Sequence, residues 1–245
     1  MITDIWTVMW KEWKELLQAR GNRRSSLWMV LMNVGIFGAF MPWQFGLQWL
    51  NSLWTVFWML FVASFWTTNL IADSFAGERE RHTLETLLAS RLSNRAILLG
   101  KYAAALAYVG GQILVSLLLG AVVVSLAHGR GQFLFYRPSV GLGAAGTGLL
   151  GAGLVAGLGI LISLRAATVR QAQQTLLIPL TVVLILPSFG TLILPADLQA
   201  RFFQWLVEAD VTTVVLGVLA VLLVIDAALL AGALARFQRA KLILD

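Results

Sequence analysis

The sequence contains no cysteine and few charged residues. Without cysteine the chain can form no disulfide, no thiolate metal site and no cysteine nucleophile. Charged residues make up 12% of the chain, about half the share of a soluble domain, whereas hydrophobic residues make up 59%. This balance predicts an integral membrane protein.

The motifs of common enzymes are also missing. No G-x-x-x-x-G-K-[ST] sequence occurs, and Leu99-Gly100-Lys101-Tyr102, a partial match, lacks the loop and the hydroxyl that cradle phosphate and magnesium. H-E-x-x-H and G-x-S-x-G are absent too. Residues 73–101 are the longest stretch outside the apolar runs, and they are too few for a nucleotide-binding domain. We therefore expect no catalytic site and no cofactor in this chain, so that any ATP must be hydrolysed by another chain.

Six apolar runs are suited to crossing a membrane. A hydrocarbon core about 30 Å thick needs roughly 20 helical residues. The predicted spans are Leu27–Trp43, Leu53–Ala72, Tyr102–Ala127, Val140–Leu164, Thr175–Leu194 and Val211–Ala235. The first is short and the fifth contains Pro179 and Pro187, so we expect both to be bent or tilted. The sequence thus predicts an all-α integral membrane protein, with six transmembrane helices in one domain over 1–245.

The basic residues lie mostly on one side of these spans. Fifteen of the eighteen Lys and Arg residues fall in 1–25, 73–101, 165–170 and 236–245. By the positive-inside rule, both termini and the 73–101 loop are predicted to be cytosolic in an inner (cytoplasmic) membrane. This asymmetry explains the net charge of +6 better than nucleic-acid binding does. His82 and His128 would lie on opposite sides, so they cannot share a metal ion.

Residues 1–25 predict an amphipathic helix that lies in the membrane interface. A stripe of apolar side chains faces away from the charged ones and consists of Ile2, Ile5, Trp6, Met9, Trp13, Leu16 and Leu17. Mixed acids and bases and the lack of a cleavage pattern argue against a signal peptide. A dimerisation helix is the alternative interpretation. Residues 195–210 predict a second short amphipathic helix, on the external side.

Small and polar residues inside the spans indicate helix packing. Gly143, Thr147 and Gly151 have the small-xxx-small spacing that permits close helix contact, as do Gly153 and Gly157. We interpret this glycine-rich run as a packing surface rather than a substrate site.

Asp226 is a clear acid within a predicted span. Its burial costs a few kcal/mol unless it is paired or protonated, so it should face the protein interior or water. Together with Asn69 and Asn33 it forms a candidate intramembrane polar site. Contact with substrate or a proton and a structural hydrogen bond to a neighbouring helix both remain open.

The polar stretch 73–101 interrupts the apolar sequence. Leu84, Leu87, Leu88 and Leu92 recur with helical spacing, so one face of a short helix would be apolar. Glu78 and Glu80 would fall in the first turn of this helix, an arrangement that the helix dipole favours. A short amphipathic helix between two spans is suited to contact something outside the membrane.

This stretch resembles the ABC-2-type transporter permeases, the membrane subunits of one class of ATP-driven exporters. These carry a sequence like E-R-E-x-x-T-L-E-x-L-L after their second span, and residues 78–88 read ERERHTLETLL. His82 stands where glycine is common, and Arg91 where proline is common. In that family the segment forms a coupling helix that docks on a separate ATPase. The resemblance therefore implies ATPase-coupling roles for Glu78, Arg79, Glu80, Thr83, Leu84, Glu85, Leu87 and Leu88.

The resemblance also implies a mode of assembly. This chain would form half of a dimeric pathway with a second permease, identical or homologous, and two copies of a separate ATPase would hold ATP and magnesium. Residues 1–25 would be the elbow helix and 78–90 the coupling helix, and transport would be export. Two alternatives are an ion-coupled transporter with Asp226 as its proton site, and a membrane assembly protein without transport activity. The sequence does not identify the cargo.

Overall fold

The computed structural model describes residues 1–18, 23–193, 195–208 and 210–237, and these residues form helices without strands. The described part of the chain is therefore all-helical, as predicted. The helices in order are α1 (Ile2–Gln18), α2 (Arg23–Gly35), the π-helix η1 (Ile36–Phe40), α3 (Met41–Phe45), α4 (Leu47–Asn51), α5 (Leu53–Glu80), α6 (Leu84–Ala89), α7 (Asn94–His128), α8 (Pro138–Ser163), α9 (Val169–Ile193), α10 (Ala196–Glu208) and α11 (Val211–Arg236).

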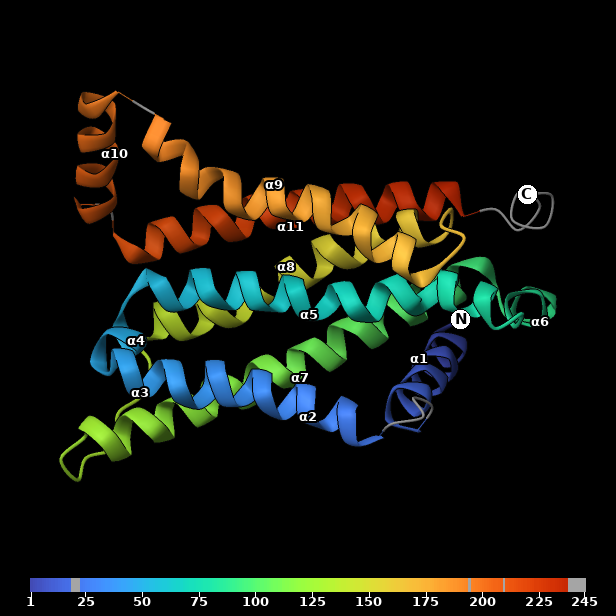
Figure 1. The fold of residues 1–245 in the computed structure, drawn as a ribbon, viewed down its shortest axis with the longest axis horizontal. Coiled ribbons are helices and arrows are strands. Elements are labelled where there is room, and N and C mark those ends of the chain that lie inside the picture. Colours follow the sequence, from blue (N-terminus) through green and yellow to red (C-terminus); the bar gives the residue numbers. More distant parts are fainter. Residues whose placement is uncertain (19–22, 194, 209, 238–245) are drawn as a thin grey trace.

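The long helices run side by side, and short helices lie at both ends of the bundle (Figure 1). Helix α8 lies at the centre and packs against α5, α7, α9 and α11. Helices α1 and α6 lie at the end where α5 and α11 terminate, and α10 stands across the opposite end (Figure 1). The bundle therefore has two distinct ends, and the predicted coupling stretch is at the α1 end.

Four of the described helices are long and apolar enough to cross a membrane, namely α5, α7, α8 and α11. They correspond to the second, third, fourth and sixth predicted spans, so the chain is a multi-pass membrane protein. The first predicted span is divided among α2, η1 and α3, where Val30–Phe45 forms a shorter apolar stretch. The predicted fifth span lies in α9, where the side chains of 183–193 are outside the described residues. The count of six spans stays a prediction.

The glycines of α8 bring neighbouring helices into close contact, as predicted. Gly151 faces α5, where an added Cβ would lie 2.5 Å from Cδ1 of Leu60. Gly143 faces α11, where it would lie 2.7 Å from Cγ1 of Val215. Because glycines lie on two faces of α8, both α5 and α11 can approach its backbone closely.

Replacing Gly159 by alanine should destabilise the bundle. A Cβ at this position would overlap Cγ2 of Ile71, which is buried and stiff because it is β-branched. We expect the free energy of unfolding to fall by about 1–3 kcal/mol, as is typical of overpacking. The matched control is Gly111→Ala on α7, where a Cβ would meet nothing within 4 Å. Thermal unfolding in detergent, followed by tryptophan fluorescence, tests this, and equal stability of the two variants would contradict it.

The helix boundaries of the 73–101 stretch differ from the prediction. Helix α5 continues to Glu80, so Glu78, Arg79 and Glu80 end this long helix and do not begin the short one. Helix α6 is only six residues long, and α7 already begins at Asn94. The charged residues continue the helix because tertiary partners, described below, satisfy them.

Candidate functional site

The predicted coupling residues come together at the α1 end of the bundle (Figure 1). Glu78, Arg79 and Glu80 occupy the last turn of α5, and Thr83 precedes α6. Leu84, Glu85 and Leu87 lie on α6, and the side chain of Leu88 is outside the described residues. The predicted set is thus divided between the end of a long helix and a short exposed one.

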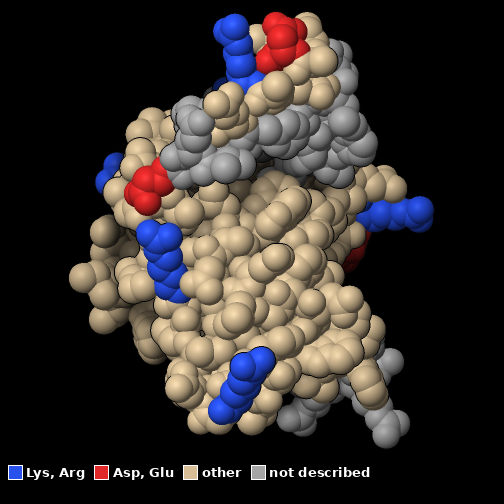
Figure 2. All heavy atoms as spheres, turned by 90° about the vertical axis from the view of Figure 1, so that its left-hand side faces the viewer, with Lys and Arg blue, Asp and Glu red and all other residues tan. Residues whose placement is uncertain are grey.

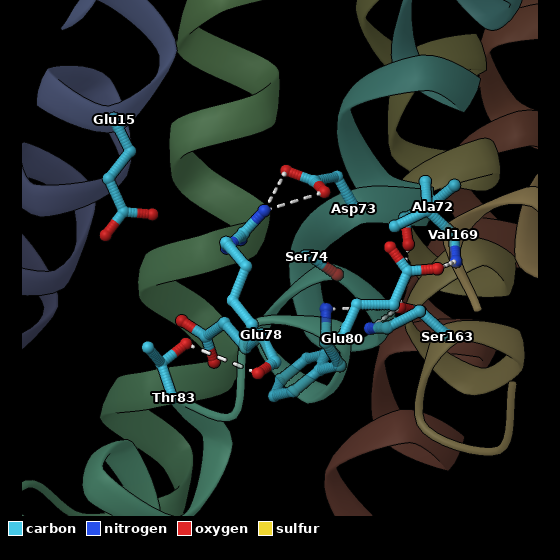
Figure 3. A network of polar contacts seen from close by, with 12 residues as sticks. Glu15, Ala72, Asp73, Ser74, Glu78, Glu80, Thr83, Ser163 and Val169 are labelled. Carbon is cyan, nitrogen blue, oxygen red and sulfur yellow. Dashed lines mark hydrogen bonds and ion pairs between the residues drawn. The ribbon is translucent and has the colours of Figure 1, made fainter. Parts of the chain in front are cut away.

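Arg79 and Glu80 fasten α5 to the connection between α8 and α9. Nη2 of Arg79 donates to the carbonyl oxygen of Leu164 at 2.9 Å, and Nη1 donates to that of Ala166. Oε1 of Glu80 accepts from the backbone N–H of Val169 at 2.9 Å, where α9 begins (Figure 3). These bonds satisfy backbone groups that helix ends leave unpaired. The two side chains therefore hold three helix ends together.

Ser163 adds a second link between α5 and α8. Its hydroxyl oxygen accepts from the backbone N–H groups of Phe75 and Ala76 at 3.1 and 2.9 Å. The same hydroxyl donates to the carbonyl oxygen of Ala72 at 3.1 Å (Figure 3). Ser163 is fully buried, and these bonds use its donor and its acceptor capacity. They fix the position of α5 one turn before Glu78.

Glu78 lies in a buried ionic cluster that joins α1, α5 and α7. Its Oε1 accepts from Nζ of Lys11 at 2.7 Å and from Nζ of Lys101 at 3.1 Å. Lys101 also donates to Oε1 of Glu12 and to the carbonyl oxygen of Ser74, both at 2.7 Å. Glu78 is 1% exposed and Lys101 is 2% exposed, so neither reaches the surface of this chain.

The electrostatics of this cluster depend on its pairing. Isolated buried charges would be strongly disfavoured, whereas paired and hydrogen-bonded ones are tolerated. Burial by itself lowers the pKa of Lys11, but the hydrogen bond and negative charge of Glu78 outweigh it and raise this pKa above its usual range. Lys11 therefore stays protonated and keeps α1 attached to α5.

The turn between α5 and α6 closes with a backbone motif that favours glycine. The backbone N–H of Thr83 donates to the carbonyl oxygen of Glu78 at 2.9 Å. The backbone N–H of His82 donates to the carbonyl oxygen of Arg79 at 3.1 Å. This is a Schellman arrangement with His82 at the left-handed position, where its φ is 55°. The conformation explains why glycine suits this position in the resembled sequence.

Replacing His82 by glycine should therefore stabilise the turn. Glycine adopts a positive φ without the steric cost that a Cβ imposes, although it increases the entropy of the unfolded chain. We expect the free energy of unfolding to rise by about 0.5–1 kcal/mol. Ala107→Gly in the exposed middle of α7 is the control and should lower it by a similar amount. Thermal unfolding measures both, and a loss of stability from His82→Gly would contradict the assigned conformation.

Helix α6 presents a small exposed surface. Leu84 is buried against α5, and Leu87 is half-buried in the same apolar cluster. Glu85, Thr86, Ala89 and Arg91 are exposed. The apolar side of α6 thus attaches it to the bundle, and its polar side faces away.

A cavity of about 600 Å³ lies between α1, α5, α6 and α7. Its lining combines charged side chains of the ionic cluster with hydroxyl groups from α6 and apolar residues farther along α5 and α7. Thr86 lines it and is also on the exposed face of α6, whereas Glu85 does not line it.

The predicted intramembrane residues lie on three different helices, α5, α11 and α2. Oδ1 of Asn69 accepts from Nε2 of Gln173 at 3.3 Å, which links α5 to α9. Asp226 on α11 is 7% exposed and packs beside Gly153 of α8, and its Oδ1 has no hydrogen-bond partner among the described residues. Asn33 is half-buried on α2. No described group of three or more His, Asp or Glu side chains is placed to hold a metal ion.

Several residues of this end were not identified from the sequence. They include Lys11 and Lys101, which bond to Glu78, Glu12, which bonds to Lys101, and Ser163, which bonds to the backbone of α5. One sequence pattern could have indicated them: Lys11, Glu12 and Glu15 can share one side of an amphipathic helix. That side was expected to face water, but the structure turns it toward α5 and α7, while Trp6 and Trp10 remain exposed.

These features define a class: a multi-pass helical membrane protein with a polar, tightly bonded group of helix ends at one end of its bundle. The sequence profile of the family described as ABC-2 type transporter matches residues 3–224. The chain belongs to this family, whose members are membrane transport components that generally pair with ABC ATPases. It is therefore a permease of an ABC transporter and not itself catalytic. No match to a curated protein was found.

Proposed function

We propose that this chain is half of a dimeric ATP-driven exporter and couples to a separate ATPase through residues 78–90. The observation that carries the proposal is the exposed polar face of α6, held on the bundle by Leu84 and directly joined to the end of α5. Glu85 and Thr86 on this face are the candidates for direct contact with the ATPase. Glu78, Arg79 and Glu80 would act by positioning, because their side chains bond within the chain.

The contacts around Glu78 suggest how movement would pass to the spans. A displacement of α6 acts on α5 through the short turn 81–83, and α5 is bonded to α1, α7 and the α8–α9 connection. An ATPase that binds α6 differently in two nucleotide states would shift the equilibrium between two arrangements of these helices. ATP and magnesium would be held by two copies of the ATPase.

The experiment that tests this function is co-purification. The permease, expressed with the ABC ATPases of its own genome in turn, should be retained with one of them, and vesicles reconstituted with that pair should hydrolyse ATP and move a cargo. Retention without ATP-dependent transport in either direction would overturn the exporter assignment. Failure to associate with any ABC ATPase of its own genome would overturn the coupling assignment.

The orientation follows from charge. Both termini and α6 would be cytosolic in an inner membrane, because the basic residues gather at the α1 end. The opposite end, seen in Figure 2, has few charged side chains among those described, and some of its basic side chains lie beside acidic ones, such as Arg137 beside Asp210. The 195–210 segment, which contains α10, would then be external.

Single-cysteine labelling tests this topology cleanly, because the natural chain has no cysteine. A cysteine at Ser90 should be protected from a membrane-impermeant thiol reagent in intact cells, and one at Gln132 should react. Permeabilised cells provide the control, in which both positions should react. Labelling of Ser90 in intact cells would overturn the orientation. Residue 239, another cytosolic position in this topology, lies outside the described residues.

The dimer would form with an identical or homologous permease. One chain supplies one α6, whereas an ATPase pair needs two coupling helices. We expect cysteine crosslinking in the membrane to trap permease pairs through α9 near 184–188, whose side chains lie outside the described residues. A functional complex with a single permease subunit would contradict this.

An ion-coupled transporter is the second candidate. The observation that favours it is the buried carboxyl oxygen of Asp226 without a described partner. Asp226→Asn distinguishes the two functions. If a proton gradient drives transport by the wild type and the variant loses this transport, ion coupling is supported. If the variant still transports with ATP, ion coupling through Asp226 is excluded.

A further inference from the structure

The cavity between α1, α5, α6 and α7 changes from apolar to polar along its length. Leu70 of α5 and Ala104 of α7 each lie ten residues from the helix terminus at the α1 end. With a rise of 1.5 Å per residue, they lie roughly 15 Å inside the bundle. Thr83 and Thr86 line the cavity at that end. Its apolar part therefore points into the membrane and its polar part toward the membrane surface.

The charges around the cavity favour a cationic group. Three basic side chains line it, namely Lys11, Arg81 and Lys101. Three acidic ones also line it, namely Glu12, Glu15 and Asp73, and the buried Glu78 that bonds Lys11 and Lys101 makes a fourth. These groups already form ion pairs: Lys11 pairs with Glu12, Glu15 and Glu78, Lys101 pairs with Glu12 and Glu78, and Arg81 pairs with Asp73. Four acids thus share three bases, and the one excess negative charge favours an ammonium group nearby.

Two buried polar atoms beside the cavity have no hydrogen-bond partner among the described residues. They are Oγ of Ser74, a lining residue that is 7% exposed, and Oε2 of Glu78, which is 1% exposed. Both oxygens can accept a hydrogen bond, and leaving a buried acceptor unpaired is costly. A ligand with several N–H donors, directly or through water, would satisfy them.

Helix α1 places the cavity at the membrane interface. Its exposed residues Ile2, Trp6 and Trp10 recur every four positions and form an apolar stripe suited to the headgroup region. On its other side, Lys11 and Glu12 face the cavity. A molecule in the adjacent lipid leaflet therefore has both an apolar and a polar surface to contact.

We propose that this cavity binds a phospholipid with a primary ammonium head group, of the phosphatidylethanolamine type. The ammonium group lies among Glu12, Glu15 and Ser74, where it shares the two carboxylates with Lys101 and Lys11. The acyl chains leave the cavity past Leu70 and Ala104. Arg81, 49% exposed and the least buried base of the lining, pairs with Asp73 at 3.1 Å through Nη1, and its remaining N–H groups are the donors proposed for the phosphate. The proposal does not rest on ATPase coupling, and lipid binding can be measured without the ATPase. Thr86 belongs both to the cavity lining and to the exposed face of α6, whereas Glu85 belongs only to that face.

Native mass spectrometry of the full-length permease in detergent tests the proposal. Phosphatidylethanolamine, phosphatidylcholine and phosphatidylglycerol with identical acyl chains are compared. We expect phosphatidylethanolamine to bind at least about threefold more tightly than the other two, since its head group alone offers a cationic N–H donor for charge-assisted hydrogen bonds to carboxylates. Equal binding of the three lipids would overturn the proposal.

Two variants locate the site. Glu15→Gln should weaken phosphatidylethanolamine binding by about three- to tenfold, whereas Asp4→Asn, an acid of the same helix that does not line the cavity, should not. Thr86→Trp, at an exposed position where folding tolerates bulk, should block the cavity and abolish the preference. An unchanged preference in both Glu15→Gln and Thr86→Trp would overturn the location. Soluble phosphoethanolamine should bind far more weakly than the lipid, and equal affinity would overturn the assignment to a lipid.

Discussion

Replacement of Lys101 by methionine is expected to lower the free energy of unfolding by about 3–5 kcal/mol, the usual consequence of breaking a buried ion pair on one side. Lys101 is 2% exposed and donates to Glu12, Glu78 and the carbonyl oxygen of Ser74. Methionine preserves most of the volume but removes the charge and the donors. The nearly buried carboxylate of Glu78 would then keep only Lys11 as an ionic partner.

Thermal unfolding in detergent, followed by the fluorescence of the ten tryptophans, measures this effect. The control is Lys14→Met, an exposed lysine of α1, which should change stability by less than about 1 kcal/mol. The double variant Lys101→Met/Glu78→Gln should recover part of the loss, because it also removes the unpaired charge. A loss of less than about 1 kcal/mol for Lys101→Met would show that the cluster is hydrated rather than buried.

Replacement of Glu85 by alanine is expected to leave membrane insertion intact and to weaken ATPase docking, or its coupling to transport, about ten- to a hundredfold. Glu85 is exposed on α6, while Leu84 beside it is buried, so the carboxylate lies at the edge of the attached face. A charge-assisted hydrogen bond to a partner is typically worth about 1.5–3 kcal/mol, which corresponds to this range. A solvated carboxylate would contribute less than about 1 kcal/mol.

The measurement compares complex yield, ATPase rate and transport in the same membranes. Arg95→Ala is the matched control, since Arg95 is also exposed but lies in the first turn of α7, beyond α6. It should have a milder effect. Transport at the wild-type rate by Glu85→Ala would show that Glu85 is a solvated surface residue. The contact with the ATPase would then have to involve Thr86 or another exposed residue of α6.

The corrections to the sequence interpretation share one cause. Glu78 and Glu80 were placed in the first turn of a short helix, because local charge patterns favour acids there. In the structure they end α5, since Lys11, Lys101 and the backbone of Val169 pair with them. Residues distant in the sequence supply these partners, so no local rule could have extended the helix past Asp73.

The sequence by itself determined the membrane class, the positions of the four longest apolar helices and the close packing of the glycine-rich α8. These properties depend on composition, on runs of apolar residues and on side-chain size, which are local. The resemblance of residues 78–88 indicated the family that the match over 3–224 then established.

The tertiary structure alone decided which charges are buried. Lys11 and Glu12 of α1 turn inward, Glu78 joins a cluster with Lys11 and Lys101, and Glu85 remains exposed a few residues away. The physical reason is that a charged side chain is stable in the interior only where partners from other helices meet it, and at the surface wherever water does. The meeting of α1, α5 and α7 is a property of the folded bundle and not of any single segment.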